Sequence, residues 1–183
     1  MIDALNDGID VDHRRLRSAP TVLSDKEVGT ALVTHGFYDK RKNPAGKGVT
    51  HDYAPLVVGD VVVLTDRATG LMWQHDGSER AVTFSSAEEY VRRLNVEKVA
   101  GFTDWRLPTM EEVGSLMEPQ AHEELHISPA FRRGVSFIWT ADHHPNGRIW
   151  IAYFADAEFV REKPDFNAWV RAVRSNVETT SGL

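Results

Sequence analysis

GFTDWRLPTMEEVGSLM, residues 101–117, contains the clearest local signal in this chain of 183 residues. The hydroxyl of Thr109 can cap a helix, and Glu112 three residues later can bond back to the cap, which is the capping-box pattern. The predicted helix would bury one apolar stripe, formed by Met110, Val113, Leu116 and Met117. Such a stripe requires a second layer of structure to cover it.

Two further helices are predicted upstream of this segment. Ser24 with Glu27 caps a first helix, which buries Val28, Ala31 and Leu32. Ser86 with Glu89 indicates the start of another, which ends near Asn95. Its apolar face has the three-and-four spacing of an amphipathic helix and consists of Phe84, Ala87, Tyr90, Val91 and Leu94.

The strands are predicted from β-branched runs separated by turns. Residues 57–64 form one strand, and the turn at 65–70 leads into an extended run at 71–74, which predicts a hairpin. Three later strands are expected at 137–141, 149–154 and 168–173, with loops at 142–148 and 155–167. We therefore predict an α+β fold in which two helices pack on short antiparallel sheets with long C-terminal loops.

The length and the 42% hydrophobic content fit one domain, which we place at residues 21–176. Residues 1–20 are expected to be a poorly ordered lead-in, and residues 177–183 a flexible tail. The net charge of −6 argues against nucleic acid or a membrane surface as partner. The chain has no cysteine and no apolar signal segment, so a cytoplasmic location is expected. We also expect a monomer.

Tryptophan and arginine side chains mark the expected core and its ties. We predict that Trp73, Trp105, Trp139 and Trp150 are buried. Asp104 and Arg106 are expected to fix the turn before the helix at 110. Arg171 and Arg174 are expected to bind carboxylates close to the last strand.

Several strings stand in the order typical of one known family. They are TGLMWQ (69–74), GFTDWRLPT (101–109), IWTA (138–141) and VRAVR (170–174), with GFYDK (36–40), NPAGKG (43–48) and SLMEP (115–119) in addition. The chain resembles the Lcl C-terminal-domain family over residues 20–174. This resemblance implies a C-type-lectin-like fold, related in architecture to formylglycine-generating enzymes. It also implies ligand recognition: some relatives are adhesins for sulfated polysaccharides, and others are variable proteins of diversity-generating retroelements with a hypermutated C-terminal segment.

The C-terminal region supplies the candidate binding residues. Alternation along 149–154 places Trp150, Ala152 and Phe154 on one face and leaves the other face for a ligand. Aromatic side chains then stand among charges in 155–169, which is typical of a recognition surface. The predicted ligand-binding residues are Ile149, Ile151, Tyr153, Asp156, Glu158, Phe159, Arg161, Asp165, Phe166, Asn167 and Trp169. We expect a protein or glycan ligand, no cofactor and no enzymatic activity.

Two segments contain residue patterns that could form a metal site. HEELH (122–126) matches HExxH, in which two histidines and a glutamate support zinc hydrolysis from one helix. Pro119 and Pro129 leave too short a segment for that helix, so a zinc hydrolase is the less favoured alternative. Asp142, His143 and His144 could hold a metal, but a solvated loop is the favoured interpretation. We therefore predict no metal site and no catalytic residue.

A fixed-specificity, adhesin-type glycan binder is the main alternative function. It would hold sulfated polysaccharide through a basic loop that contains Lys40, Arg41, Lys42 and Lys47. Such binding would weaken with salt, because it depends on exposed charges.

Overall fold

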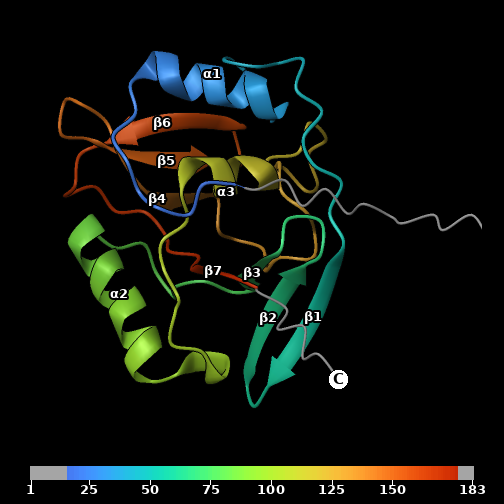
Figure 1. The fold of residues 1–183 in the computed structure, drawn as a ribbon, viewed down its shortest axis with the longest axis vertical. Helices are drawn as coiled ribbons and strands as arrows, with labels where there is room; N and C mark the ends of the chain where they lie inside the picture. Colours follow the sequence, from blue (N-terminus) through green and yellow to red (C-terminus); the bar gives the residue numbers. More distant parts are fainter. Residues whose placement is uncertain (1–15, 177–183) are drawn as a thin grey trace, which may run out of the picture.

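The computed structural model describes residues 16–176, and within this range two antiparallel sheets are combined with three α-helices (Figure 1). The helices are α1 (Asp25–His35), α2 (Phe84–Val96) and α3 (Met110–Leu116), with a short 3-10 helix η1 (Val99–Gly101). The strands are β1 (Tyr53–Val58), β2 (Val61–Asp66), β3 (Leu71–Gln74), β4 (Phe137–His143), β5 (Ile149–Tyr153), β6 (Glu158–Glu162) and β7 (Val173–Ser175). The architecture is α+β, as predicted.

The strands form a four-stranded sheet in the order β1-β2-β3-β7 and a three-stranded sheet in the order β4-β5-β6. The last strand thus pairs with the hairpin of the first half, since Trp73 lies opposite Val173. An isolated bridge from Ile138 to Trp169 ties the segment before β7 to the smaller sheet. The C-terminal segment therefore joins the two sheets.

The smaller sheet is buried on both faces. The first core lies between this sheet and the helices α1 and α3, and it contains Trp150 and Phe159. The second core contains the apolar face of α2 together with Trp139, Ile149 and Ile151. Figure 1 shows α1 and α3 beside β5 and β6, while α2 stands apart on the other side. Because both faces are covered, successive side chains along these strands point alternately into the first and the second core, and neither face is open to solvent along its whole length.

Two of the three predicted helix N-caps are confirmed. Ser24 with Glu27 and Thr109 with Glu112 form complete capping boxes. The cap of α2 was predicted at the wrong residue, because the helix begins at Phe84 after Thr83, which makes no side-chain cap bond. Burial of the Phe84 ring, which is 8% exposed, explains the earlier start, since the side chain must join the second core.

Three strand predictions need correction. The run 57–64 is two strands, because a turn at Gly59 (φ 59°) and Asp60 separates β1 from β2. β6 lies inside the predicted loop 155–167, where the apolar residues Phe159 and Val160 pack on opposite faces of the sheet. The predicted strand 168–173 contains only isolated bridges before β7 begins at Val173.

The four tryptophans predicted as core are at most 2% exposed. Arg174 binds Asp104 as expected, with Nε 2.6 Å from the carboxylate, and Arg106 binds Glu112 in α3. The expectation for Arg171 is wrong: its side chain is fully buried and donates only to backbone carbonyl groups. The reason lies in its environment, since the Phe131 ring and not a carboxylate packs against its guanidinium group.

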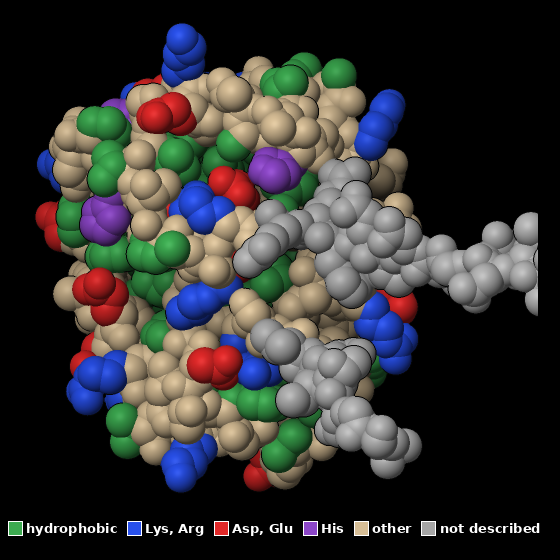
Figure 2. Space-filling view, viewed as in Figure 1, with side chains coloured by type: hydrophobic (Ala, Val, Ile, Leu, Met, Phe, Trp, Pro, Cys, Tyr) green, Lys and Arg blue, Asp and Glu red, His purple; other side chains and the backbone are tan. Residues whose placement is uncertain are grey.

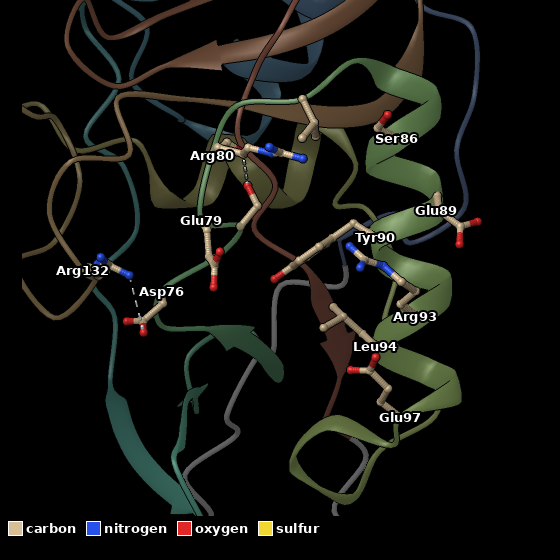
Figure 3. Close-up of a pocket in the computed structure, with 13 residues that line it drawn as sticks. Asp76, Glu79, Arg80, Ser86, Glu89, Tyr90, Arg93, Leu94, Glu97 and Arg132 are labelled. Carbon is tan, nitrogen blue, oxygen red and sulfur yellow. Dashed lines mark hydrogen bonds and ion pairs between the residues drawn. The ribbon is translucent and has the colours of Figure 1, made fainter.

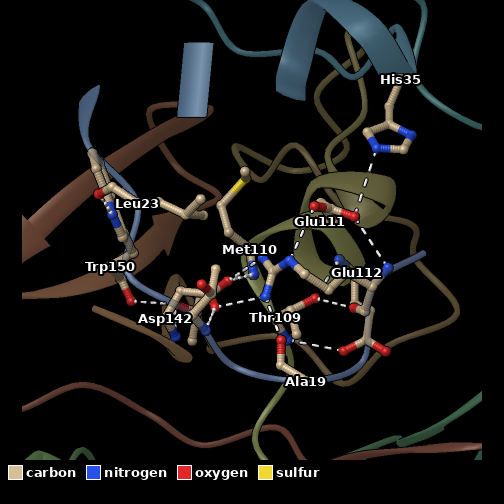
Figure 4. A network of polar contacts seen from close by, with 12 residues as sticks. Ala19, Leu23, His35, Thr109, Met110, Glu111, Glu112, Asp142 and Trp150 are labelled. Atoms are coloured by element: carbon tan, nitrogen blue, oxygen red, sulfur yellow. Dashed lines mark hydrogen bonds and ion pairs between the residues drawn. The ribbon is translucent and has the colours of Figure 1, made fainter. Parts of the chain in front are cut away.

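A network centred on Asp142 ties the start of the described chain to the smaller sheet (Figure 4). Asp142 is fully buried in β4, so the prediction of a solvated loop at this position is wrong. Its carboxylate accepts bonds from both terminal nitrogens of Arg17 and from the backbone N–H groups of Thr21 and Met110. The carboxylate thereby neutralises Arg17 and satisfies the first N–H of α3.

Of the predicted lead-in, residues 1–15 lie outside the described residues, as does the predicted tail at 177–183. Residues 16–20 are described, and there Arg17 also binds Glu111 of α3 at 3.1 Å. No helix in the described part of the chain is long and apolar enough to cross a membrane. The face shown in Figure 2 carries acidic, basic and apolar side chains interspersed, without a patch of one charge.

Candidate ligand-binding surface

The candidate surface lies on the face of β5 and β6 that belongs to the second core. The register places Ile149, Ile151 and Tyr153 opposite Glu162, Val160 and Glu158. Ile149 and Ile151 are covered, while Tyr153 at the strand end is only partly buried. The surface is thus the open end of a face whose remainder is core.

Four partly buried aromatic rings form what we call the aromatic surface, which consists of Phe137, Tyr153, Phe166 and Trp169. Phe137 is central: it stacks on Tyr153 at 4.7 Å between ring centroids and meets the edge of Trp169 at 4.9 Å. Phe166 lies 5.9 Å from Phe137. Rings held by one another in this way are pre-ordered, so a ligand would bury them at a small cost in entropy.

A shallow acidic hollow of about 190 Å³ adjoins the aromatic surface, and Tyr153 belongs to both. Its other lining residues are Asp156, Glu158, Val160 and Glu162. Burial raises the pKa of the Tyr153 hydroxyl, and the negative charges of Glu162 and Asp156 raise it further. The hydroxyl is therefore a neutral hydrogen-bond donor next to carboxylate acceptors, an arrangement that suits a polar or cationic group of a ligand.

Three predicted binding residues are not available to a ligand in this structure, because Ile149, Ile151 and Phe159 are at most 1% exposed. Glu158 lines the acidic hollow, but it is only 8% exposed and pairs with Arg41 at 2.7 Å. The prediction that Ile149, Ile151 and Tyr153 share one face of β5 is confirmed, but the prediction that this face is open to a ligand is wrong for the two isoleucines. The segment 163–170 folds over that face, where Phe166 contacts the edge of Trp139 and Ala168 joins the second core.

The structure separates Arg161 from the other candidates. Arg161 lies on the opposite face of β6, where it pairs with Asp25 of α1 and its guanidinium stands 5.8 Å from the Trp150 ring. Asp156, Asp165 and Asn167 are exposed, as predicted. The predicted residues that come together are therefore Tyr153, Asp156 and the largely buried Glu158 at the hollow, with Phe166 and Trp169 at the aromatic surface.

Sequence reasoning missed Phe137, the ring at the centre of the aromatic surface. It was counted only as the first residue of a predicted strand. A usable signal existed, because Phe137 and Trp139 are two residues apart and must share a face of β4. What periodicity could not supply is the antiparallel register that places Phe137 opposite Tyr153.

A larger groove of about 830 Å³ separates α2 from the segment 76–82 (Figure 3). Acidic and basic side chains line it together, and the Tyr90 side chain reaches across it from α2 toward the opposite segment. The Tyr90 hydroxyl accepts a bond from Gln74, whose oxygen accepts from the Ala172 backbone. An ion pair between Arg132 and Asp76 at 3.9 Å closes one end. Tyr90 thus supports the core while it lines the groove.

Neither metal pattern has the geometry of a metal site. The HExxH segment is not helical, because Glu123 (φ 49°) and Glu124 (φ 70°) adopt left-handed backbone angles in a tight turn between His122 and Leu125. His144 pairs with Asp25 at 3.3 Å, and Asp142 is committed to Arg17. No group of three or more potential metal ligands occurs among residues 16–176.

One comparison with known proteins gives a match. The model of the family described as Lcl C-terminal domain matches residues 62–174, which is more than half of the chain and contains both the aromatic surface and the acidic hollow. No curated protein and no solved structure matches the chain. The chain belongs to the Lcl C-terminal domain family.

Proposed function

We propose that this chain is a non-enzymatic recognition domain with a C-type-lectin-like fold, and that it binds a protein ligand through its aromatic surface and acidic hollow. The observation that carries the proposal is the group of four partly exposed rings, three of them packed on Phe137, beside a hollow lined by carboxylates. Aromatic anchors of this kind dominate binding energy at protein interfaces. Membership of the family supports a role in recognition.

The finer form of the proposal is that the chain is the diversified target protein of a diversity-generating retroelement. The segment 148–174 combines a fixed scaffold with replaceable side chains. Trp150, Ile151 and Phe159 are fully buried, whereas the side chains of Asp156, Asp165 and Asn167 are exposed and make no hydrogen bond or ion pair with the rest of the described chain. Variation at the exposed positions would change the ligand and leave the two cores intact.

The adhesin-type alternative has less support from the side-chain contacts. Of the four basic residues proposed to hold a sulfated glycan, Arg41 pairs with Glu158, and Lys42 donates to the carbonyl of Phe159 at 2.5 Å. Lys40 and Lys47 are exposed, and their side chains make no such contact within residues 16–176. Two exposed ammonium groups provide little attraction for a polyanion in a chain with a net charge of −6.

Substitution of Tyr153 by alanine should weaken ligand binding by about 30-fold or more, because a central aromatic anchor contributes about 2 kcal/mol. A phage-displayed peptide library panned on the wild-type protein, and counter-selected on the Tyr153→Ala/Trp169→Ala variant, supplies the probe. Calorimetric titration of an enriched synthetic peptide then measures Kd for each single variant.

Val57→Ala is the matched control, since Val57 is 65% exposed on β1 of the other sheet and its loss should leave Kd unchanged. Heparin in the same titration tests the glycan alternative. Peptides that bind wild type and the folded Tyr153→Ala variant equally, or a library from which none is enriched over the double variant, would contradict the proposal.

If the segment 148–174 is diversified by a retroelement, the DNA that flanks the gene should contain the parts of that element. A reverse-transcriptase gene and a near-identical copy of codons 148–174 should be present, with the differences mainly at adenines. These differences should fall at exposed positions such as Asp156, Asp165 and Asn167 and spare Trp150 and Ile151, whose side chains are buried. Sequencing this DNA is the test: without the repeat, the domain has a fixed specificity.

A further inference from the structure

Arg171 is a fully buried arginine, and among residues 16–176 it has no direct carboxylate partner. Its Nη2 atom donates to the carbonyl oxygens of His75 and Arg132, at 3.3 and 3.4 Å, which are long for hydrogen bonds. Its Nε and Nη1 atoms have no hydrogen-bond partner among the described residues. A guanidinium group presents five N–H donors, so several of them remain unsatisfied in the interior.

Two other buried donors share this property and this place. Trp73 Nε1 and the Tyr53 hydroxyl also have no partner among residues 16–176, and together with Arg171 they account for four of the five such side-chain atoms there. All three side chains surround the Phe131 ring. The guanidinium carbon of Arg171 lies 4.6 Å from the ring centroid, and the rings of Tyr53 and Trp73 meet it edge-on at 5.3 and 6.5 Å.

The cluster carries a positive charge. Burial lowers the pKa of Arg171 to about 10, which leaves the side chain protonated at neutral pH. Burial also raises the pKa of Tyr53 well above its usual range, so its hydroxyl is neutral. Asp76 acts on Arg171 through space, but the Asp76 side chain is 56% exposed and is bonded to His75 and Arg132. A buried charge without a direct partner is strongly destabilising.

We infer that Arg171, Trp73 and Tyr53 form an internal binding site for a small monovalent anion of about the size of chloride. The indole N–H can only donate, the guanidinium N–H groups can only donate, and the neutral tyrosine hydroxyl can donate as well. A single anion accepts several such bonds and supplies the missing negative charge. The bonds would be charge-assisted and therefore stronger than bonds to neutral acceptors.

The segment that covers Arg171 also borders the large groove. Asp76 and Arg132 line one end of the groove. The bonds from Arg171 are accepted by the backbone carbonyl of Arg132 and by that of His75, the residue before Asp76. An anion bound there would join the segments around residues 53, 73, 131 and 171. We therefore expect anion binding to stabilise the folded domain without any effect on the aromatic surface.

The test is thermal unfolding in chloride and in gluconate at equal ionic strength, because gluconate is too large for an interior site. The wild-type midpoint should rise by about 3–6 °C when chloride exceeds its Kd tenfold. Arg171→Met should abolish the difference between the two salts. Trp73→Phe keeps the ring and removes one donor, so it should weaken the chloride Kd about tenfold and keep the fold.

Arg174→Met is the matched control, since Arg174 pairs with Asp104 outside the cluster and its loss should leave the chloride effect unchanged. Crystals grown in bromide give a direct readout that does not depend on any variant. An anomalous peak within hydrogen-bond distance of Arg171 Nε or Nη1 supports the site. A wild-type midpoint that is equal in the two salts, or bromide peaks only elsewhere, overturns it.

Discussion

Asp142→Asn should lower the free energy of unfolding by about 3–5 kcal/mol, which is the usual cost of removing one partner from a buried ion pair. The Asp142 carboxylate is fully buried and accepts from Arg17 at 2.7 and 2.8 Å, from Thr21 at 2.8 Å and from Met110 at 2.7 Å. An asparagine amide keeps the shape but places an NH₂ group against one of these donors. Arg17 would then also lose one of its two carboxylate partners and keep only Glu111, at 3.1 Å.

Urea denaturation at neutral pH measures the effect. Asp156→Asn is the control, because Asp156 is exposed and its loss should change stability by less than about 0.5 kcal/mol. Arg17→Met completes a double-mutant cycle with Asp142→Asn, and a coupling energy of about 1–3 kcal/mol is expected for groups in direct contact. A loss below about 1 kcal/mol in Asp142→Asn would show that the network of Figure 4 does not support the fold.

The Asp142 network shows which parts of the fold the sequence could predict. The capping boxes at Ser24 and Thr109 were predictable because each cap and its partner are three residues apart. Arg17 and Asp142 are 125 positions apart, and an Asp-His-His string has the composition of a loop. No local pattern can pair two such residues.

The sequence likewise predicted the local features of the candidate site but not the contacts between distant segments. Alternation assigned Tyr153 and Ile151 to one face of β5 correctly, because the side-chain period of a strand depends on the backbone alone. Whether that face meets solvent depends on the segment 163–170, which returns across it with Phe166. Phe137 was missed for a related reason, since only the register between β4 and β5 brings it to Tyr153.

Trp150→Ala should lower the free energy of unfolding by about 3–5 kcal/mol, and the cause is a cavity in the first core. Trp150 is fully buried, and its Nε1 atom donates to the carbonyl oxygen of Leu23 at 2.9 Å. Alanine would remove the ring against which His144 packs edge-on, at 5.6 Å between centroids. It would also leave the Leu23 carbonyl without this donor.

The matched variant is Asp156→Ala, because Asp156 lies three residues beyond β5 on an exposed turn. Comparing its stability with that of Trp150→Ala tests whether the segment 148–174 contains both scaffold and replaceable positions. Both positions lie in the stretch proposed to vary, but of the two only Asp156 lies outside the core. The free energy of unfolding of its alanine variant should therefore be within about 0.5 kcal/mol of that of the wild type. Urea titration of the two variants measures the difference. Comparable losses at both positions would mean that burial does not divide this segment into scaffold and replaceable residues. The proposal of a diversified surface requires that division, because a domain of this size has a margin of only about 5–15 kcal/mol and would not survive repeated changes at positions such as Trp150.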